Sequence, residues 1–414
     1  MTDRSRRLAF DILKAVEADG GYSNILLNRR LEHAENADPA LVRDLVHGVL
    51  KNETLLDWQI ARFLKKPGLR LQAKLLLRLG FYQLAFRGDI PDYTAVDETV
   101  ALARDVMRGN EGFVNAVLRS FLRDGKTLRY PDHDPDDADS LAAYLSVRYS
   151  CQPWIVRLWL DAYGAEQTER LLAESLKTPP LVLRPNRLKT DRTDGFDLAG
   201  GIRSSGDYKE GCFSVQDASA LEAVDALQPR RGERVLDVCA APGGKTCAMA
   251  ELMENEGSIL ACDVHEGKLK LVEREARRLG ISIIRTCARD ARTAPPGDES
   301  AFYDAVLCDV PCSGLGVLRR KPEIKLRLKE ENAKALPAVQ SAILANAARF
   351  VRPGGRLMYC TCTVNPAENE GVTHAFLADG GFEKCAERQI FTGEQAEGPA
   401  GDGFYYCLMR KRIL

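Results

Sequence analysis

The chain has 414 residues, of which 45% are apolar and 28% charged, and its formal net charge is −1. This length allows two or three domains with complete cores, and the composition is typical of an ordinary soluble globular protein. Because the net charge is close to zero, any contact with nucleic acid has to come from local clusters of Lys and Arg.

Several classes of protein are excluded by features that the sequence lacks. No apolar run approaches the length of a membrane span, and the first residues do not form the core of a signal peptide. The 12 cysteines form no CxxC pair, and none of the five histidines is spaced to pair with a cysteine. We therefore expect no structural disulfide, no metal, no membrane attachment and a cytoplasmic location.

The first part of the chain, from about residue 4 to residue 123, is predicted to be helical almost throughout. Apolar residues recur there at helical spacing, as at Leu8 and Ile12. We predict an all-α domain over residues 1–128. An acidic, proline-containing linker without periodicity follows at residues 129–140.

A small mixed α/β segment is predicted at residues 141–220. It contains two helical stretches, at 154–163 and 166–176, and an extended stretch at 181–184.

From about residue 221 to residue 414, strand-like and helix-like segments alternate. Strands are expected near 234–239, 258–263, 281–286, 303–309, 355–360, 382–385 and 404–410, with helices near 245–253, 266–279, 331–351 and 368–378. This alternation is typical of a parallel sheet with helices on both faces. We therefore predict a doubly wound, mostly parallel seven-stranded α/β fold.

A glycine turn joins the first of these strands to its helix. The turn at residues 240–244 (AAPGG) leads into a helix at Lys245, as in open α/β sheets that hold a nucleotide. The phosphate-binding patterns GxxxxGK[ST] and GxGxxG are both absent. Asp263 and Asp290 follow the next two strands and suit ribose hydroxyls and an adenine amino group, although each alone is also explained as a helix cap. A nucleoside without a pyrophosphate points to S-adenosylmethionine.

Two cysteines end neighbouring strands of the predicted sheet. Cys312 lies in the sequence DVPCSG and Cys362 in YCTCT, so both open onto one crevice beside the glycine turn. A thiolate that adds to carbon 6 of a pyrimidine makes carbon 5 reactive toward a sulfonium methyl group. Asp309 is the candidate for a contact with ring N3, and Lys245 for lowering a thiol pKa or contacting the substrate.

Two other classes of methyltransferase fit these motifs less well. Enzymes that methylate amino groups favour an Asp/Asn-Pro-Pro-aromatic loop at the fourth strand, whereas Cys312 takes the third place here. Radical methylases need a three-cysteine cluster, which the sequence does not contain.

A basic cluster follows the Cys312 motif. It consists of Arg319, Arg320, Lys321 and Lys325, and its position favours contacts with substrate phosphates over a merely solvated loop. The helical region has a second candidate basic face, for which simple solubility is an equally good explanation. Its residues are Arg29, Arg30, Lys65, Lys66, Arg70 and Lys74.

Taken together, these motifs resemble those of the RNA cytosine-5 methyltransferases, and specifically the RsmB (Sun/Fmu) family of small-subunit rRNA enzymes. The resemblance extends over essentially the whole chain. It includes CAAPGGKT at 239–246, DVPCSG at 309–314, TC at 361–362 with NPAEN at 365–369, and SVQDAS at 214–219. The helical region resembles NusB, an RNA-binding antitermination factor, through RDLVHGV at 43–49 and NAVLR at 115–119.

The resemblance implies a Rossmann-like methyltransferase domain over residues 221–414 and a role for each site residue. Cys362 is implied as the nucleophile, Cys312 as the group that assists product release, and Asp309 as the contact to cytosine N3. The implied cofactor contacts are Cys239, Ala240, Ala241, Pro242, Gly243, Gly244, Lys245, Asp263, Asp290 and Asp309. Because DNA cytosine methylases attack from a Pro-Cys motif instead, the roles of the two thiols rest on this resemblance and not on spacing.

Two mild departures from the family pattern are present. Val310 stands where Ala is common, and Arg289 stands where Gly often precedes the third-strand Asp, which leaves the adenine contact of Asp290 less certain.

We therefore expect methylation of carbon 5 of a cytosine in 16S rRNA, with S-adenosylmethionine as donor and a covalent Cys–C6 adduct. By resemblance the target is cytosine 967. The expected partner is naked 16S rRNA or an early assembly intermediate, and a monomer is expected. The alternatives are cytosine-5 methylation of another RNA such as tRNA, and a non-catalytic RNA-binding or antitermination scaffold.

Overall fold

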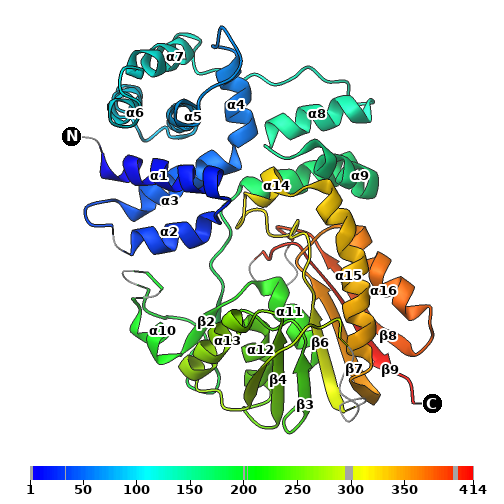
Figure 1. Cartoon of the computed structure of the whole chain (residues 1–414). Coiled ribbons are helices and arrows are strands. Elements are labelled where there is room, and N and C mark those ends of the chain that lie inside the picture. Colours follow the sequence, from blue (N-terminus) through cyan, green and yellow to red (C-terminus); the bar gives the residue numbers. More distant parts are fainter. Residues whose placement is uncertain are drawn as a thin grey trace. The chain divides into compact units, whose positions relative to one another are not determined.

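The computed structural model describes residues 3–32, 34–198, 201–202, 204–293, 302–394 and 400–413. Its chain divides into two compact units (Figure 1). The first contains Met1–Thr178 and Leu318–Leu328, and the second contains Pro179–Val317 and Lys329–Leu414. Residues 141–220, predicted as one segment, are thus divided between the two units.

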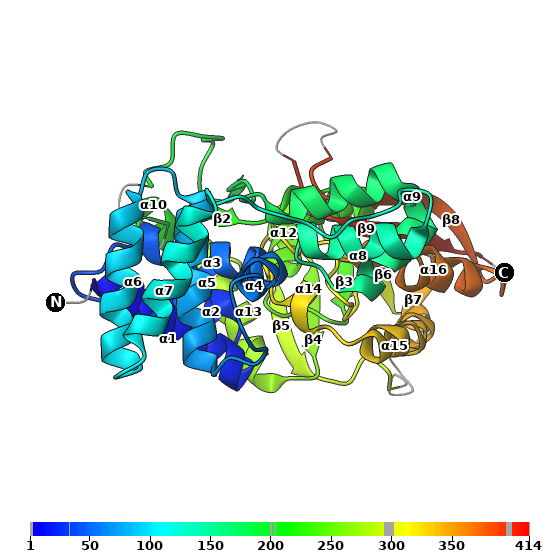
Figure 2. The same ribbon diagram turned by 90° about the horizontal axis from the view of Figure 1, so that it is seen from above.

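The first unit consists of helices, of which those between residues 4 and 123 enclose one apolar core. They are α1 (Arg4–Asp19), α2 (Ser23–Leu31), α3 (Pro39–Lys51), α4 (Glu53–Ala61), α5 (Leu71–Phe86), α6 (Asp92–Val106), α7 (Glu111–Arg123), α8 (Ala138–Arg148), α9 (Pro153–Leu176) and α14 (Ile324–Arg327). Figure 1 and Figure 2 both draw α6 and α7 side by side. The prediction of helices throughout the first part of the chain is therefore confirmed.

Local sequence signals set the limits of these helices. Asp38 caps α3, its Oδ1 accepting the N–H of Ala40 at 2.9 Å, and Pro39 occupies the first turn. α9 is broken at Gly164, whose φ is 76°. The two helical stretches predicted on either side of that glycine are thus confirmed.

One segment of the first unit comes from late in the chain and is anchored by two buried charged side chains. Glu323 is 3% exposed and accepts the N–H of Ser23 at 2.9 Å. Lys325 is fully buried, and its Nζ donates to the carbonyl oxygens of Lys51 at 2.9 Å and Tyr149 at 2.7 Å. The segment that follows the Cys312 motif therefore belongs to the interior of the helical unit.

The second unit is built on a seven-stranded sheet of order β5-β4-β3-β6-β7-β9-β8. β3 to β7 are parallel to one another, whereas β9 pairs antiparallel with both β7 and β8. The strands are β3 (Arg234–Asp237), β4 (Ser258–Asp263), β5 (Ile284–Ala288), β6 (Tyr303–Asp309), β7 (Val351–Thr361), β8 (Phe382–Ile390) and β9 (Phe404–Lys411). This is the doubly wound fold that the alternation of segments predicts.

Helices cover both faces of this sheet. α11 (Ala218–Leu227), α12 (Gly244–Leu252) and α13 (Glu266–Leu279) share an apolar core with one face. α15 (Glu330–Ala348) and α16 (Glu370–Leu377) share a second core with the other face, and they lie together in Figure 1 and Figure 2. A short ladder of β1 (Leu183–Pro185) and β2 (Phe213–Val215), the helix α10 (Gly206–Glu210) and the 3-10 turn η2 (Pro366–Glu368) complete the unit.

Across the described ranges, no helix is both long enough and apolar enough to cross a lipid bilayer.

Candidate active site

The order of the strands brings three motif-bearing strand ends together. β3 pairs with β6 and β6 pairs with β7, all in parallel, so their carboxyl ends share one edge of the sheet. In this register Asp309 lies opposite Cys360. The predicted proximity of the Cys312 loop, the Cys362 loop and the glycine turn is thus present in the structure.

The thiols of Cys312 and Cys362 are in contact. Their Sγ atoms are 3.2 Å apart, and both side chains are half-buried. The hydrogen bond to Cys362 and then burial raise the pKa of the Cys312 thiol well above its ordinary value. When two thiols are hydrogen-bonded to each other, ionisation of one makes ionisation of the other harder. At most one of the two cysteines is therefore expected to act as a thiolate.

The two cysteine loops are held together by a close approach of backbone at Gly316. Its N–H donates to the carbonyl of Cys362 at 3.0 Å, and its own carbonyl accepts from the N–H of Gly403 at 2.9 Å. A Cβ added at Gly316 would lie 1.9 Å from the Gly403 oxygen. Only glycine fits this position, because any side chain would push the loops apart.

A half-buried ion pair lies at the same edge of the sheet. Lys245 Nζ, from the first turn of α12, is 2.7 Å from Asp309 Oδ2, and the Cys360 thiol is 3.6 Å from Asp309 Oδ1. Burial opposes the charge of Lys245, but Asp309 and the nearby Cys360 and Cys362 outweigh it, so its pKa is raised. Lys245 therefore carries a positive charge beside the thiols.

The glycine turn after β3 is organised by a buried carboxylate. Asp237 is 1% exposed; it accepts the Thr246 hydroxyl at 2.7 Å and the N–H of Cys239 at 3.3 Å. Burial raises the pKa of Asp237 to about 7. Gly243 has a φ of 108°, and a Cβ there would come within 3.0 Å of Val272 in α13. The loop is therefore fixed from both sides.

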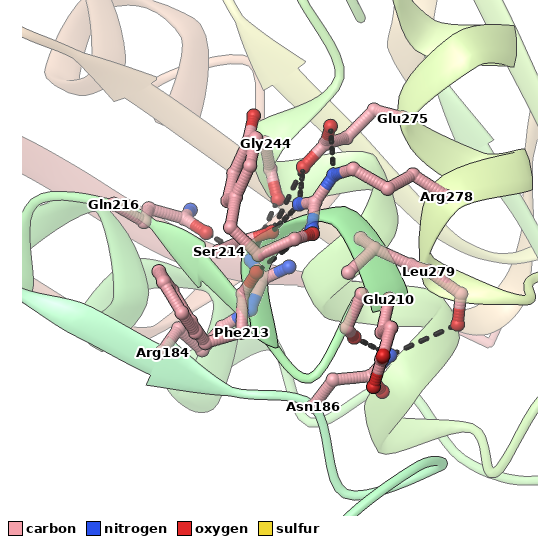
Figure 3. A network of polar contacts seen from close by, with 12 residues as sticks. Arg184, Asn186, Glu210, Phe213, Ser214, Gln216, Gly244, Glu275, Arg278 and Leu279 are labelled. Atoms are coloured by element: carbon pink, nitrogen blue, oxygen red, sulfur yellow. Dashed lines mark hydrogen bonds and ion pairs between the residues drawn. The ribbon is translucent and has the colours of Figure 1, made fainter. Parts of the chain in front are cut away.

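A second support reaches this loop from the β1–β2 ladder (Figure 3). Arg184, on β1, donates to the carbonyl of Gly244 at 3.0 Å and to Glu251 at 2.8 Å, and it also bonds Gln216. Both charged side chains of the Arg184–Glu251 pair are less than 10% exposed. Arg278 similarly ties the ladder to the end of α13, donating to the carbonyl of Phe213 at 3.0 Å.

Asp263 and Asp290 follow neighbouring strands as predicted. Asp263 ends β4, is half-buried, and accepts the N–H of His265, the residue before α13, at 2.9 Å. Asp290 follows β5 and pairs with Arg292 at 2.6 Å, which lowers the pKa of Asp290 to about 2. Asp263 therefore does not cap α13, whose first turn has no side-chain cap. A ligand that binds Asp290 would have to share this carboxylate with Arg292.

The predicted basic cluster is divided by the fold, and the expectation for Lys325 has to be corrected. Because Lys325 is fully buried and bonded to two backbone carbonyls, it offers no surface to RNA phosphates. Arg319 is only 3% exposed. Lys321 is exposed and Arg320 half-buried. A charge run in a sequence does not reveal docking against another part of the chain, which is why these positions were misjudged.

On the second candidate face, Arg29, Arg30, Lys65, Lys66 and Arg70 are exposed. Lys74 forms an ion pair with Asp57, with 3.2 Å between Nζ and Oδ2.

Three site residues were not singled out from the sequence. Cys360 lies in the same motif as Cys362, two residues before it and inside β7, which ends at Thr361. Gly316 had a weak signal, as one glycine among several in the loop. Glu368 was noted only within the motif NPAEN, and nothing in its spacing indicated that it is buried.

Comparison with known proteins is consistent with this arrangement. The sequence matches the NusB family over residues 3–123, an RsmF/B-like ferredoxin-like domain over 152–198, and the 16S rRNA methyltransferase RsmB/F family over 224–409. The probable ribosomal RNA small subunit methyltransferase B of Bacillus subtilis is 36% identical, over 98% of each chain. The ribosomal RNA small subunit methyltransferase B of Pseudomonas syringae is 33% identical, over 98% of this chain and 96% of its own.

Among solved structures, the crystal structure of PH0851 has the same fold along almost the entire chain. It superposes with a TM-score of 0.80, at 24% identity, covering 99% of each chain. Full-length similarity above 30% to the bacterial relatives establishes the family as well as the fold. The chain therefore belongs to the RsmB/F family of 16S rRNA methyltransferases, which use S-adenosylmethionine as methyl donor.

Proposed function

We propose that this protein methylates carbon 5 of a cytosine in 16S rRNA through a covalent adduct with Cys362, and that cytosine 967 is the target. The observation that carries this proposal is the contact of two thiols, 3.2 Å apart, at the carboxyl ends of adjacent parallel strands. A methyl transfer to nitrogen or oxygen needs no thiol, whereas carbon 5 of a pyrimidine does need a nucleophile at carbon 6.

The donor-binding site fits a cationic nucleoside. Asp237, Asp263 and Asp290 lie at the ends of successive strands. Asp263 and Asp290, together with Asp237 above its pKa of about 7, form a negative set that suits a sulfonium and an ammonium group but repels a pyrophosphate. Gly243 keeps the backbone of the loop free of side chains. Of the implied contacts, we assign the ribose to Asp263 and the adenine amino group to Asp290, with the loop from Cys239 to Lys245 around the methionine part. When bound, S-adenosylmethionine supplies an electrophilic methyl group.

In the proposed reaction, the Cys362 thiolate adds to carbon 6 of the flipped cytosine, and electrons move into the ring. Asp309 is assigned the contact to N3, where it has to donate a proton to stabilise this charge. The Lys245 ammonium, 2.7 Å from Asp309, can supply that proton, and it returns when elimination restores the ring. Carbon 5 then takes the methyl group. The carbon 5 proton leaves to a base, for which we assign Cys312, and elimination restores the aromatic ring and the Cys362 thiolate.

Electrostatics supports this division of roles between the thiols. The Lys245 ammonium acts on the thiol of Cys362, and a positive neighbour stabilises a thiolate. The thiol of Cys312 has a pKa held well above its ordinary value, first by its hydrogen bond to Cys362 and then by burial. Cys362 is thus the better nucleophile while both thiols are free, and Cys312 becomes available once Cys362 is bound to the substrate.

For RNA phosphates we retain Lys321 and Arg320, which have exposed surface. The exposed lysines and arginines of the helical unit are the further candidates, among them Lys65 and Lys66.

The test is release of tritium from carbon 5 of labelled cytosine in 16S RNA. Cys362→Ala is expected to lower the rate by about a thousandfold or more, whereas Cys312→Ala is expected to accumulate a covalent protein–RNA adduct that survives denaturation. Cys385→Ala, which removes an exposed thiol on β8, is the matched control and should behave as wild type.

The alternatives give different results in the same assay. Release from tRNA but not from 16S RNA would indicate another RNA substrate. RNA binding without any release would indicate a scaffold. Normal release by Cys362→Ala would overturn the assignment of the nucleophile.

A further inference from the structure

Glu368 is a buried carboxylate between the two thiol loops. It lies in η2, which begins four residues after Cys362, and it is fully buried. Its Oε2 accepts the N–H of Ser313 at 2.8 Å and the side-chain amide of Gln340 at 2.9 Å, while its Oε1 accepts the amide of Asn365 at 2.8 Å.

All three of these donors are neutral. Within the described ranges, no Lys or Arg forms an ion pair with Glu368. Burying a carboxylate costs free energy that neutral hydrogen bonds only partly offset, and an apolar residue of similar volume would avoid this cost. The Glu368 carboxylate is therefore expected to have a functional role in addition to any contribution to stability.

The hydrogen bonds of Glu368 join the two thiol loops on both sides. Ser313 directly follows Cys312, and Pro311 directly precedes Cys312. Gln340 also donates to the carbonyl of Pro311 at 3.0 Å. On the other loop, the Glu368 carbonyl accepts the hydroxyl of Tyr359, in the strand that leads to Cys362, at 2.5 Å. One residue thus connects the backbone around Cys312 with the strand that carries Cys362.

The charge of Glu368 also acts on Cys312. The groups that face this thiol are Cys362 at the end of β7, Tyr359 earlier in β7, and Glu368 in η2. The hydrogen bond to Cys362 is the largest cause of the raised pKa of Cys312, burial follows, and the negative charge of Glu368 adds to both. Tyr359 stays neutral, because burial raises its pKa as well.

We propose that Glu368 is a positioning residue that fixes the Cys312 turn against the Cys362 loop and keeps Cys312 a neutral thiol until Cys362 has reacted. This proposal rests on the proposed function. The Lys245 cation acts on Cys362 and the Glu368 anion acts on Cys312, although the two sulfur atoms are only 3.2 Å apart. When Cys362 is bound to carbon 6, its hydrogen bond to Cys312 is lost, and with it the largest cause of the raised Cys312 pKa. Cys312 can then lose its own proton to solvent, and the resulting thiolate accepts the carbon 5 proton.

The first experiment measures the ionisation of Cys312 without any RNA. Alkylation by iodoacetamide is followed against pH in the full-length Cys362→Ala chain, and modified Cys312 is quantified by peptide mass spectrometry. Cys312 is expected to react as a thiol that ionises above the ordinary value of about 8.5. Introducing Glu368→Gln removes the charge, and alkylation of Cys312 at pH 8 should rise roughly tenfold.

A matched variant separates the charge from the hydrogen bonds. Gln340→Leu removes the donor to Pro311 and Glu368 but leaves the carboxylate in place. In the Cys362→Ala background, Gln340→Leu should leave the pH midpoint of Cys312 alkylation unchanged. In protein that retains Cys362, the same substitution should lower turnover about tenfold or more without changing the KM for S-adenosylmethionine. A role in folding alone would instead lower the melting temperature in both variants without moving the alkylation midpoint.

The outcomes distinguish this inference from the function on which it rests. If wild-type protein releases no tritium from cytosine, the proposed function fails, whatever the alkylation shows. If wild-type protein is active but Cys312 ionises below the ordinary value in the Cys362→Ala chain, the inference about Glu368 is overturned. This second result needs no Glu368 variant, so it stands even if Glu368→Gln does not fold. An unshifted profile in a folded Glu368→Gln variant would also overturn it.

Discussion

Replacing Gly316 by alanine tests how closely the two thiol loops must approach for turnover. The new Cβ would lie 1.9 Å from the oxygen of Gly403 and 2.9 Å from the oxygen of Cys362. The first distance falls about 1.4 Å short of the roughly 3.3 Å at which carbon and oxygen normally meet. Because both obstacles are backbone atoms, the loops themselves have to move. Overpacking of this kind costs about 1–3 kcal/mol of stability.

The loss of activity should exceed what this loss of stability explains. A displacement of about 1 Å at reacting groups lowers turnover about a hundredfold, so kcat for tritium release should fall by about that factor. Binding of S-adenosylmethionine, measured by calorimetry, should change less than about threefold, because the glycine turn after β3 is held by Asp237 and Arg184 instead.

Gly381→Ala is the matched control, since a Cβ there would meet nothing within 4 Å. It should leave both kcat and the melting temperature unchanged. If Gly316→Ala loses stability but keeps the wild-type kcat, the close contact of the thiols is not needed for the reaction.

Three further predictions concern charged groups. The pKa of Asp237, raised by burial to about 7, means that its carboxylate charges as pH rises through 7. Binding of the cationic donor should therefore strengthen between pH 6 and 8 in calorimetric titrations, and Asp237→Asn should flatten this dependence. Arg184→Met leaves Glu251 buried without its partner and should lower the free energy of unfolding of the second unit by about 3 kcal/mol in urea denaturation. The double variant Arg184→Met/Glu251→Met should regain much of this stability. An Arg184→Met variant as stable as wild type would contradict the role of the pair. Burial lowers the pKa of Lys325 to about 7, so the unfolded chain binds more protons above that pH. Stability of the helical unit should rise between pH 7 and 10, and Lys325→Met should make the rise smaller; Lys51, whose pKa burial lowers to about 8, is a further source. An equal slope in both proteins would exclude Lys325 as a source.

The sequence predicted those parts of the fold that depend on local patterns. The break of α9 at Gly164 and the strand–turn–helix around Gly243 follow from periodicity and from glycine positions, and both are present. The nearness of Cys312 to Cys362 follows from topology, because consecutive parallel strands of a doubly wound sheet are neighbours here. The edge strand β8 was predicted too short, since its charged residues do not alternate with apolar ones.

Features that depend on distant parts of the chain could not be predicted. Lys325 looked like an RNA contact because a lysine in a charge run is usually solvated, and only the carbonyls of Lys51 and Tyr149 explain its burial. The Arg184–Glu251 pair joins residues far apart in sequence with no shared pattern. The burial of the Glu368 carboxylate is explained only by three hydrogen-bond donors from different segments of the chain.

The passage of Leu318–Leu328 into the helical unit has a consequence for anyone who dissects this protein. A fragment that starts after Thr178 would keep Glu323 and Lys325 but lose Ser23, Lys51 and Tyr149, whose backbone groups bond the side chains of these two residues. Such a truncation would expose buried residues of the segment 318–328, with polar groups that lack their hydrogen-bond partners and an increased tendency to aggregate. If the fragment were inactive, the result would reveal nothing about RNA recognition. Inserting Ser23→Ala or Glu323→Gln into the intact polypeptide is the cleaner way to ask what the amino-terminal half contributes.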